Sequence, residues 1–167
     1  MEQRVVGHLD ELGATYTMMD CDPDLADTAA FCEAYGVAPE DSANAILVAS
    51  KRPPGHFAVS LVLATTRLDV NRTVRDLMGV KKLSFADAAV TADKTGMLIG
   101  GVTPFGLPPD IPVYVDAMVV ERPEVIVGGG SRSKKVRLDP EVFTRMPGVE
   151  VVAGLAKPFE PPPEMEG

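Results

Sequence analysis

The sequence has no tryptophan, only two cysteines and only two histidines among its 167 residues. Two cysteines cannot form a disulfide framework, and the spacing of Cys21 and Cys32 fits no zinc pattern, so we expect free thiols and no metal site. His8 and His56 stand in no arrangement typical of a catalytic triad. The chain also lacks a Walker loop and a dinucleotide-binding glycine pattern, which argues against those two kinds of nucleotide site.

Long hydrophobic runs are absent as well. No stretch approaches the roughly 18 consecutive apolar residues that a membrane-spanning helix needs. The first residues, Met1-Glu2-Gln3-Arg4, do not have the basic and then apolar layout of a secretory signal. We therefore expect a cytoplasmic protein without a membrane partner.

Basic residues are few: 16 Lys and Arg stand against 24 Asp and Glu, which gives a net charge of −8. This sum argues against a general nucleic-acid-binding protein, and no DNA partner is expected. The charge is uneven, with −9 in residues 1–50, +4 in residues 51–147 and −3 in the remainder. On charge alone a solvated acidic surface is favoured, but the mildly basic middle segment leaves room for a small polyanion site.

The length and the order of the apolar segments predict one compact α+β domain with a mixed, mainly antiparallel sheet and surrounding helices. We expect this domain over residues 1–155 and a proline-rich, disordered tail over residues 156–167. Helices are expected where apolar residues recur at helical spacing between capping residues, over 2–12, 27–35, 69–78, 88–95 and 140–146. Ser84 and Asp87 form the Ser-x-x-Asp pattern of a capping box for the fourth of these helices. Strands are expected at the short apolar runs 15–19, 45–49, 57–63, 97–99, 112–115, 125–127, 136–138 and 149–152.

A glycine-rich loop is the most unusual segment of the sequence. Residues 95–107 hold four glycines and Pro104 between apolar stretches. Glycine allows backbone N–H groups to approach a ligand closely, so such a loop can form an oxyanion hole. The alternative is a tight connection between strands, which the glycines by themselves favour.

A second glycine segment, Gly128-Gly129-Gly130, leads into four basic residues within positions 132–137. Exposed amides followed by positive charge suit phosphate contacts, whereas a basic hairpin that only improves solubility explains the charges equally well. Asp116 follows an apolar strand and can be catalytic or can cap the next turn; capping is favoured.

These landmarks together resemble the YbaK-like family of aminoacyl-tRNA deacylases, the free-standing relatives of the editing domain of bacterial prolyl-tRNA synthetases. The resemblance covers about residues 1–152, and its most specific part is the Gly100-x-x-x-Pro104 loop with Phe105-Gly106. The other matching segments are residues 29–37, 67–70, 78–82, 95–96, 112–116, 128–132 and 138–141.

The resemblance implies hydrolysis of the ester that joins a wrongly attached small amino acid to the 3′ end of a tRNA. It implies that the amides of Gly100 and Gly101 stabilise the oxyanion, without a metal, an organic cofactor or a protein nucleophile. Asn44, Thr103, Pro104, Phe105, Asp116, Gly129 and Gly130 are then expected at the substrate. Arg132, Lys134 and Lys135 are expected at the phosphates of the acceptor end. The tRNA acceptor end is the implied partner, with an aminoacyl-tRNA synthetase as a second one.

One position departs from the family pattern. The family carries a lysine at the start of the first central strand, and Asn44 occupies this position here. Asparagine donates hydrogen bonds but carries no charge, which removes about 1–2 kcal/mol of charge-assisted interaction. Lys51 and Lys94 are not assigned as substitutes. Two functions therefore stay open: a trans-editing deacylase, and a binding module of the same fold with impaired catalysis.

Overall fold

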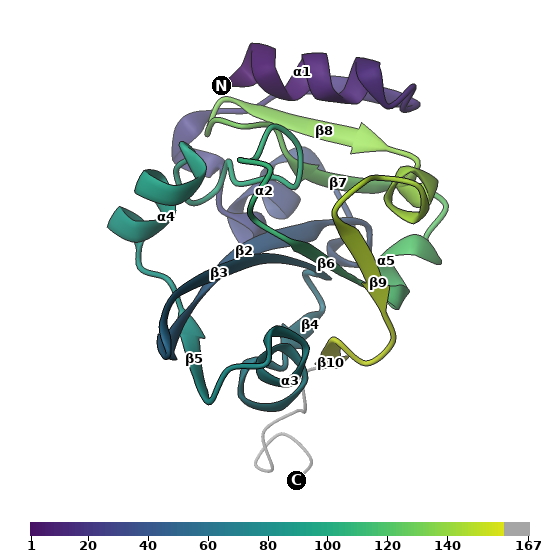
Figure 1. Ribbon diagram of the computed structural model, residues 1–167. Helices are drawn as coiled ribbons and strands as arrows, with labels where there is room; N and C mark the ends of the chain where they lie inside the picture. The colour runs from purple at the N-terminus through teal and green to yellow at the C-terminus, as the bar shows by residue number, and fades with distance from the viewer. Residues whose placement is uncertain (159–167) are drawn as a thin grey trace, which may run out of the picture.

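The computed structural model describes residues 1–158, and its strands form three sheets (Figure 1). The largest sheet has five strands, in the order β5-β2-β3-β6-β9, and crosses the middle of the molecule in Figure 1. A three-stranded sheet, β1-β8-β7, lies above it in this view, and the pair β10-β4 lies below. The expected α+β class with a mixed sheet is confirmed.

The centre of the five-stranded sheet is a hairpin of two long apolar segments. Strands β2 (Ala43–Arg52) and β3 (Pro54–Leu63) pair antiparallel, as expected from their runs of apolar residues. The short strand β5 (Lys82–Phe85) pairs antiparallel with the other edge of β2. Beyond β3, strands β6 (Val113–Asp116) and β9 (Val149–Val152) pair in parallel, which makes the sheet mixed.

The second sheet carries the basic segment. Its middle strand β8 (Lys134–Leu138) pairs antiparallel with β1 (Tyr16–Asp20) on one side and with β7 (Val125–Gly128) on the other. The small pair joins β4 (Thr66–Leu68) to β10 (Ala156–Pro158).

Short helices connect and cover the sheets, with α1 along the second sheet at the top of Figure 1. The α-helices are α1 (Glu2–Glu11), α2 (Thr28–Tyr35), α3 (Arg75–Met78), α4 (Ala88–Thr95) and α5 (Ala117–Val120). The remaining helical turns are η1 (Pro23–Leu25), η2 (Pro39–Asp41), η3 (Val70–Val74) and η4 (Pro140–Thr144). None of the helices within residues 1–158 has the length and apolar character needed to cross a membrane.

Two hydrophobic cores lie on the two faces of the central sheet, and the pleat of β2 decides which residue enters which core. Ala43 and Leu47 belong to the core shared with the second sheet, whereas Val48 belongs to the core under β4 and β10. Successive strand residues alternate between faces, which places Ala43 and Leu47 on the side of the second sheet.

Three expectations about local structure differ from what is observed. Residues 97–99 form no strand: they lead into a turn that the hydrogen bond from the Gly101 N–H to the Leu98 carbonyl closes, and Leu98 and Ile99 are exposed there instead of packed in a sheet. Asp87 does cap α4 by accepting from the Val90 N–H at 2.8 Å, but Ser84 lies in strand β5 and takes no part in the cap. Residues 156–158 form β10, so the folded chain extends past the expected boundary at 155; residues 159–167 of the expected tail lie outside the described residues.

Candidate functional site

The two glycine segments lie against each other, backbone to backbone. The Gly130 N–H donates to the Gly101 carbonyl at 2.9 Å. A Cβ atom at Gly101 would stand 2.5 Å from the Ser131 carbonyl carbon, and a Cβ atom at Gly128 would meet the Val102 backbone. Glycine is therefore required here because the two backbones approach more closely than any side chain allows. Segments about thirty residues apart thus form one wall.

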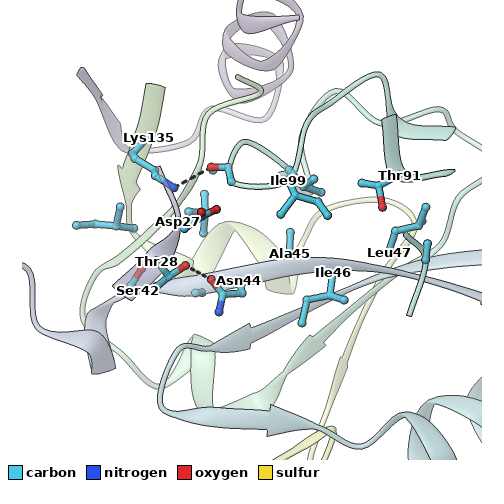
Figure 2. A pocket seen from close by; sticks show the side chains of 17 residues that line it. Asp27, Thr28, Ser42, Asn44, Ala45, Ile46, Leu47, Thr91, Ile99 and Lys135 are labelled. Carbon is cyan, nitrogen blue, oxygen red and sulfur yellow. Dashed lines mark hydrogen bonds between the residues drawn. The ribbon is translucent and has the colours of Figure 1, made fainter. Parts of the chain in front are cut away.

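A cavity of about 340 Å³ opens between this wall and strand β2 (Figure 2). Its volume is in the range of small-ligand sites. The lining comes from β2, α4, the α2 N-terminus and both glycine segments, and includes small and aliphatic side chains as well as a few polar ones. The lining residues are Asp27, Thr28, Ser42, Ala43, Asn44, Ala45, Ile46, Leu47, Ala86, Thr91, Ile99, Gly100, Val102, Ile126, Val127, Gly128 and Lys135.

Lys135 is buried at one end of this cavity, with a relative exposure of 6%. Its Nζ donates to the Gly100 carbonyl at 2.8 Å and to the Ala26 carbonyl at 2.6 Å, and it lies 5.2 Å from the centre of the Phe31 ring. Burial lowers the pKa of this amine from its ordinary value, because desolvation disfavours the charged form. Lys135 was expected at tRNA phosphates outside the pocket, but the structure places its amine inside it.

Asn44 lies at the edge of the same cavity, in a fixed orientation. The Thr28 hydroxyl donates to its Oδ1 atom, as the dashed line in Figure 2 shows. The amide nitrogen of Asn44 remains as a donor. Thr28 comes from the first turn of α2, so this bond joins α2 to the beginning of β2.

Arg132 clamps the glycine loop from the side. Its Nη1 donates to the Ile99 carbonyl at 2.6 Å and to the Asp27 carboxylate at 3.1 Å, and its Nε donates to the Pro23 carbonyl at 3.0 Å. The guanidinium is thus engaged with the protein itself, next to the cavity mouth. It fixes the carbonyl that precedes Gly100.

The N–H groups of the glycine loop differ in availability. The Gly101 N–H donates to the Leu98 carbonyl at 2.8 Å, so it closes a turn instead of facing a ligand. Within residues 1–158, the Gly100 N–H has no hydrogen-bond partner. Gly100 has a φ of +96°, a conformation that favours glycine. Of the two expected oxyanion donors, only Gly100 has its amide free in this structure.

Six of the seven expected substrate residues lie away from the cavity lining, four of them on other parts of the fold and Gly129 and Gly130 behind the glycine wall. Thr103 is fully buried, and Phe105 stacks on Phe143 in the core with 5.7 Å between ring centres. Pro104 lines a different cavity, which contains His8. Asp116 lies at the end of β6, away from both glycine segments. The position of a residue in the motif did not predict where its side chain points, because neighbouring residues of a loop face different elements.

Asp116 is nevertheless an unusual carboxylate. It is 1% exposed, and neither oxygen forms a hydrogen bond of normal geometry within the described chain. Burial raises its pKa, and the nearby backbone N–H groups of Ala156, Leu155 and Ala117 offset this effect only in part. The favoured capping role is not observed, since its side chain makes no cap hydrogen bond to α5.

The remaining expected residues support the wall from behind. The Gly129 N–H donates to the Lys134 carbonyl at 3.1 Å, and Gly130 packs against α1 near Val5. The Lys134 ammonium pairs with Asp20. These residues shape the glycine wall but do not line the cavity.

Sequence reasoning missed several residues of the site. Asp27, Thr28, Thr91 and Ile99 line the cavity, as does the buried Lys135. Ile99 gave a usable signal in the sequence, because it is an apolar residue within a glycine-rich loop that need not be a strand. In the structure it is 49% exposed. The other residues carry no local signal, since tertiary packing alone brings α2, α4 and β8 to β2.

The fold and the cavity define a class: a mixed-sheet α+β domain with a small-ligand cavity between its central sheet and two glycine segments. The chain belongs to the aminoacyl-tRNA editing domain family, whose profile matches residues 22–146. This confirms the resemblance inferred from the motifs and gives the chain a deacylase-like role in aminoacyl-tRNA editing.

Three similar proteins are related to this chain in sequence or in fold. YwhH, an uncharacterised protein of Bacillus subtilis, is 30% identical over 111 residues, which cover 66% of this chain and 70% of YwhH. The crystal structure of the hypothetical protein APE2540 matches with a TM-score of 0.82 at 23% identity, covering 92% of this chain and 99% of that one. A candidate trans-editing enzyme for prolyl-tRNA synthetase matches with a TM-score of 0.77 at 23% identity, covering 95% and 97%. At these identities the two structures establish the fold.

Proposed function

We propose that this protein is a trans-editing deacylase that removes a small, wrongly attached amino acid from the 3′ end of a tRNA. One observation carries the proposal: within the fold of an editing domain, the cavity is lined by Gly100, whose N–H has no hydrogen-bond partner within residues 1–158. The structural similarity to a candidate trans-editing enzyme for prolyl-tRNA synthetase supports action on a tRNA released from such a synthetase. The site of action is then the cytoplasm, where tRNA is charged.

In this reaction a water oxygen attacks the ester carbonyl carbon. The Gly100 N–H stabilises the negative charge that develops on the carbonyl oxygen, which is typically worth about 3–4 kcal/mol for one donor. The bond between the carbonyl carbon and the ribose oxygen then breaks, and the ribose oxygen takes up a proton that originates from the water. Amino acid and tRNA leave as separate products.

Size selection follows from the walls of the cavity. Ala43 and Ala45 line the cavity from β2, and Val102 and Val127 line it from the glycine segments and β7. The cavity of about 340 Å³ must hold the aminoacyl group and part of the terminal ribose, and the aliphatic side chains in its walls favour a short side chain on the substrate. Steric exclusion of larger side chains is how hydrolytic editing sites discriminate.

A panel of mischarged tRNAs tests the proposal. The wild-type protein is incubated with tRNAs that carry Gly, Ala, Ser, Thr, Cys or Leu, and release of the amino acid is followed over time. We expect release of one or more of the small amino acids and no release of Leu. If every ester stays intact at high protein concentration, the deacylase assignment is overturned.

The alternative is a binding module with impaired catalysis, and Asn44 is the observation that favours it. The Asn44 Oδ1 atom accepts a hydrogen bond from the Thr28 hydroxyl, and the residues of β2 that line the cavity include no cation. Such a module binds 3′-deoxy-3′-(L-alanylamino)adenosine, whose amide linkage resists hydrolysis, but leaves all esters of the panel intact. Binding of this analogue in calorimetry, together with intact esters in the panel, identifies the binding module.

A further inference from the structure

The cavity holds a cation at a place where the sequence pattern does not predict one. Among its lining residues within the described chain, Lys135 is the only one with a positive charge. It lies on β8, in the sheet opposite β2. Asn44, at the position of the family lysine, lines the same cavity from β2. The charge that Asn44 lacks is therefore present at another point of the same lining.

The surroundings of Lys135 leave its ammonium able to bind a ligand. An ammonium has three N–H donors, and the Ala26 and Gly100 carbonyls accept two of them. Carbonyl acceptors orient the group without cancelling its charge. The carboxylate of the lining, Asp27, is bound to Arg132 and is largely exposed. One of the three N–H donors therefore has no hydrogen-bond acceptor within the described chain, and the amine lies 5.2 Å from the centre of the Phe31 ring.

Lys135 also adjoins the proposed oxyanion donor through the backbone. Its Nζ binds the carbonyl of Gly100, whose own N–H has no partner within residues 1–158. In Figure 2 the Lys135 amine points along the glycine loop toward this carbonyl. The ammonium and the free amide thus belong to the same end of the cavity.

We propose that Lys135 is the substrate-binding cation of this pocket, and that it donates to the carbonyl oxygen of the aminoacyl ester in place of a lysine at position 44. This inference rests on the proposed function for the identity of the ligand. Asn44 fits the arrangement, because a second ammonium lining the same small cavity would repel the first. The neutral amide of Asn44 avoids this repulsion and accepts a hydrogen bond from the Thr28 hydroxyl.

The first test removes the charge but keeps hydrogen-bond donors. Lys135→Gln retains an amide that can donate to a backbone carbonyl, and Arg137→Gln is the matched control. Arg137 lies on the same face of the same strand and pairs with Glu124 outside the cavity. We expect kcat/KM for the ester found in the panel to fall about 10- to 100-fold in Lys135→Gln, the range for a hydrogen bond to a charged group, and to stay unchanged in the control. A folded Lys135→Gln protein with the wild-type rate overturns the inference.

The second test separates a charge in the pocket from a merely structural role of Lys135. In the Asn44→Lys, Lys135→Gln double variant, a new ammonium enters the same cavity from β2. We expect kcat/KM to be about tenfold higher than in Lys135→Gln, because the interaction that Lys135→Gln removes is a charge-assisted hydrogen bond to the substrate. A loss of the Gly100 contact alone would not be repaired from position 44. No recovery in a double variant that melts as cooperatively as the wild type overturns the inference.

A binding measurement keeps this inference separate from the proposed function. Calorimetry with 3′-deoxy-3′-(L-alanylamino)adenosine requires no catalysis, so it is informative even if the panel shows no hydrolysis. We expect the wild-type protein to bind this probe about tenfold or more tightly than Lys135→Gln does. Equal affinities, or no binding to the wild type, overturn the role of Lys135. Intact esters in the panel overturn only the deacylase.

Discussion

At the residue scale, two buried ionisable side chains have opposite surroundings. Lys135 donates hydrogen bonds to two carbonyl oxygens, and this arrangement orients its amine at the cavity. Asp116 has no hydrogen bond of normal geometry within the described chain and lies away from the cavity. Desolvation is the main effect on both: it lowers the pKa of the amine and raises that of the carboxyl.

The raised pKa of Asp116 predicts a pH-dependent stability. A carboxyl whose pKa rises on folding binds its proton more tightly in the folded state, so stability falls as the pH rises from about 3.8 through the raised value. The amide in the Asp116→Asn variant does not titrate, so the variant does not lose stability in this way as the pH rises. We expect the melting temperature of the variant, relative to the wild type, to shift upward by a few degrees between about pH 4 and pH 8. Thermal melts across this range measure it, and parallel curves for the two proteins would contradict a raised pKa.

At the scale of elements, the glycine segments act as a contact surface between two loops. The hydrogen bond from Gly130 to Gly101 and the close approach of Gly101 to Ser131 hold residues 98–102 against residues 128–131. The cavity wall is therefore formed by backbone. The shape of the wall depends on glycines, which have no side chain. The glycine pattern therefore identifies this segment in the sequence although it contains no catalytic side chain.

Substitution at this contact should cost stability. A methyl group at Gly101 would overlap the Ser131 backbone, and overpacking of this kind costs about 3 kcal/mol, so Gly101→Ala should lower the free energy of unfolding by that order. Gly7→Ala is the control, since its Cβ meets nothing within 4 Å in helix α1. The control should raise stability by about 0.5–1 kcal/mol, because alanine favours helix more than glycine does. Urea unfolding measures both, and an unchanged Gly101→Ala protein would mean that the loops are not packed this closely.

At the scale of the whole molecule, the charge has consequences for tRNA binding. The net charge is −8, and most basic side chains of the 132–137 segment have partners within the protein. Arg132 pairs with Asp27, Lys134 with Asp20 and Arg137 with Glu124, while Lys135 is buried in the pocket. Within residues 1–158 this segment therefore offers a tRNA little positive charge that is not already paired or buried.

Such a surface predicts weak and only moderately salt-sensitive association with tRNA. Contact with two or three phosphates of the single-stranded acceptor end gives a slope of log K against log salt of about −2. Fluorescence anisotropy with a labelled tRNA between about 50 and 200 mM salt measures the slope. A slope several times steeper would reveal a broad basic surface, which the charges of the described residues do not provide.

The sequence by itself determined the fold class, most of the elements and the family. The apolar runs of β2 and β3, the caps at Asp87 and Gly96 and the glycine loops are local signals, because backbone conformation and strand or helix periodicity depend on near neighbours. The sequence also placed Gly100 and Asn44 at the site.

Only the tertiary structure decided which side chains meet in the cavity. Lys135 enters it because β7, which pairs with β8, packs against β2, and Asp116 does not because it lies next to Leu155 and Ala156. Likewise the Gly101 amide is used within its own turn, whereas that of Gly100 stays free within residues 1–158. Contacts between segments about ninety residues apart leave no mark in local periodicity, so the place of the cation, and with it the chemistry of the pocket, emerged only from the packed chain.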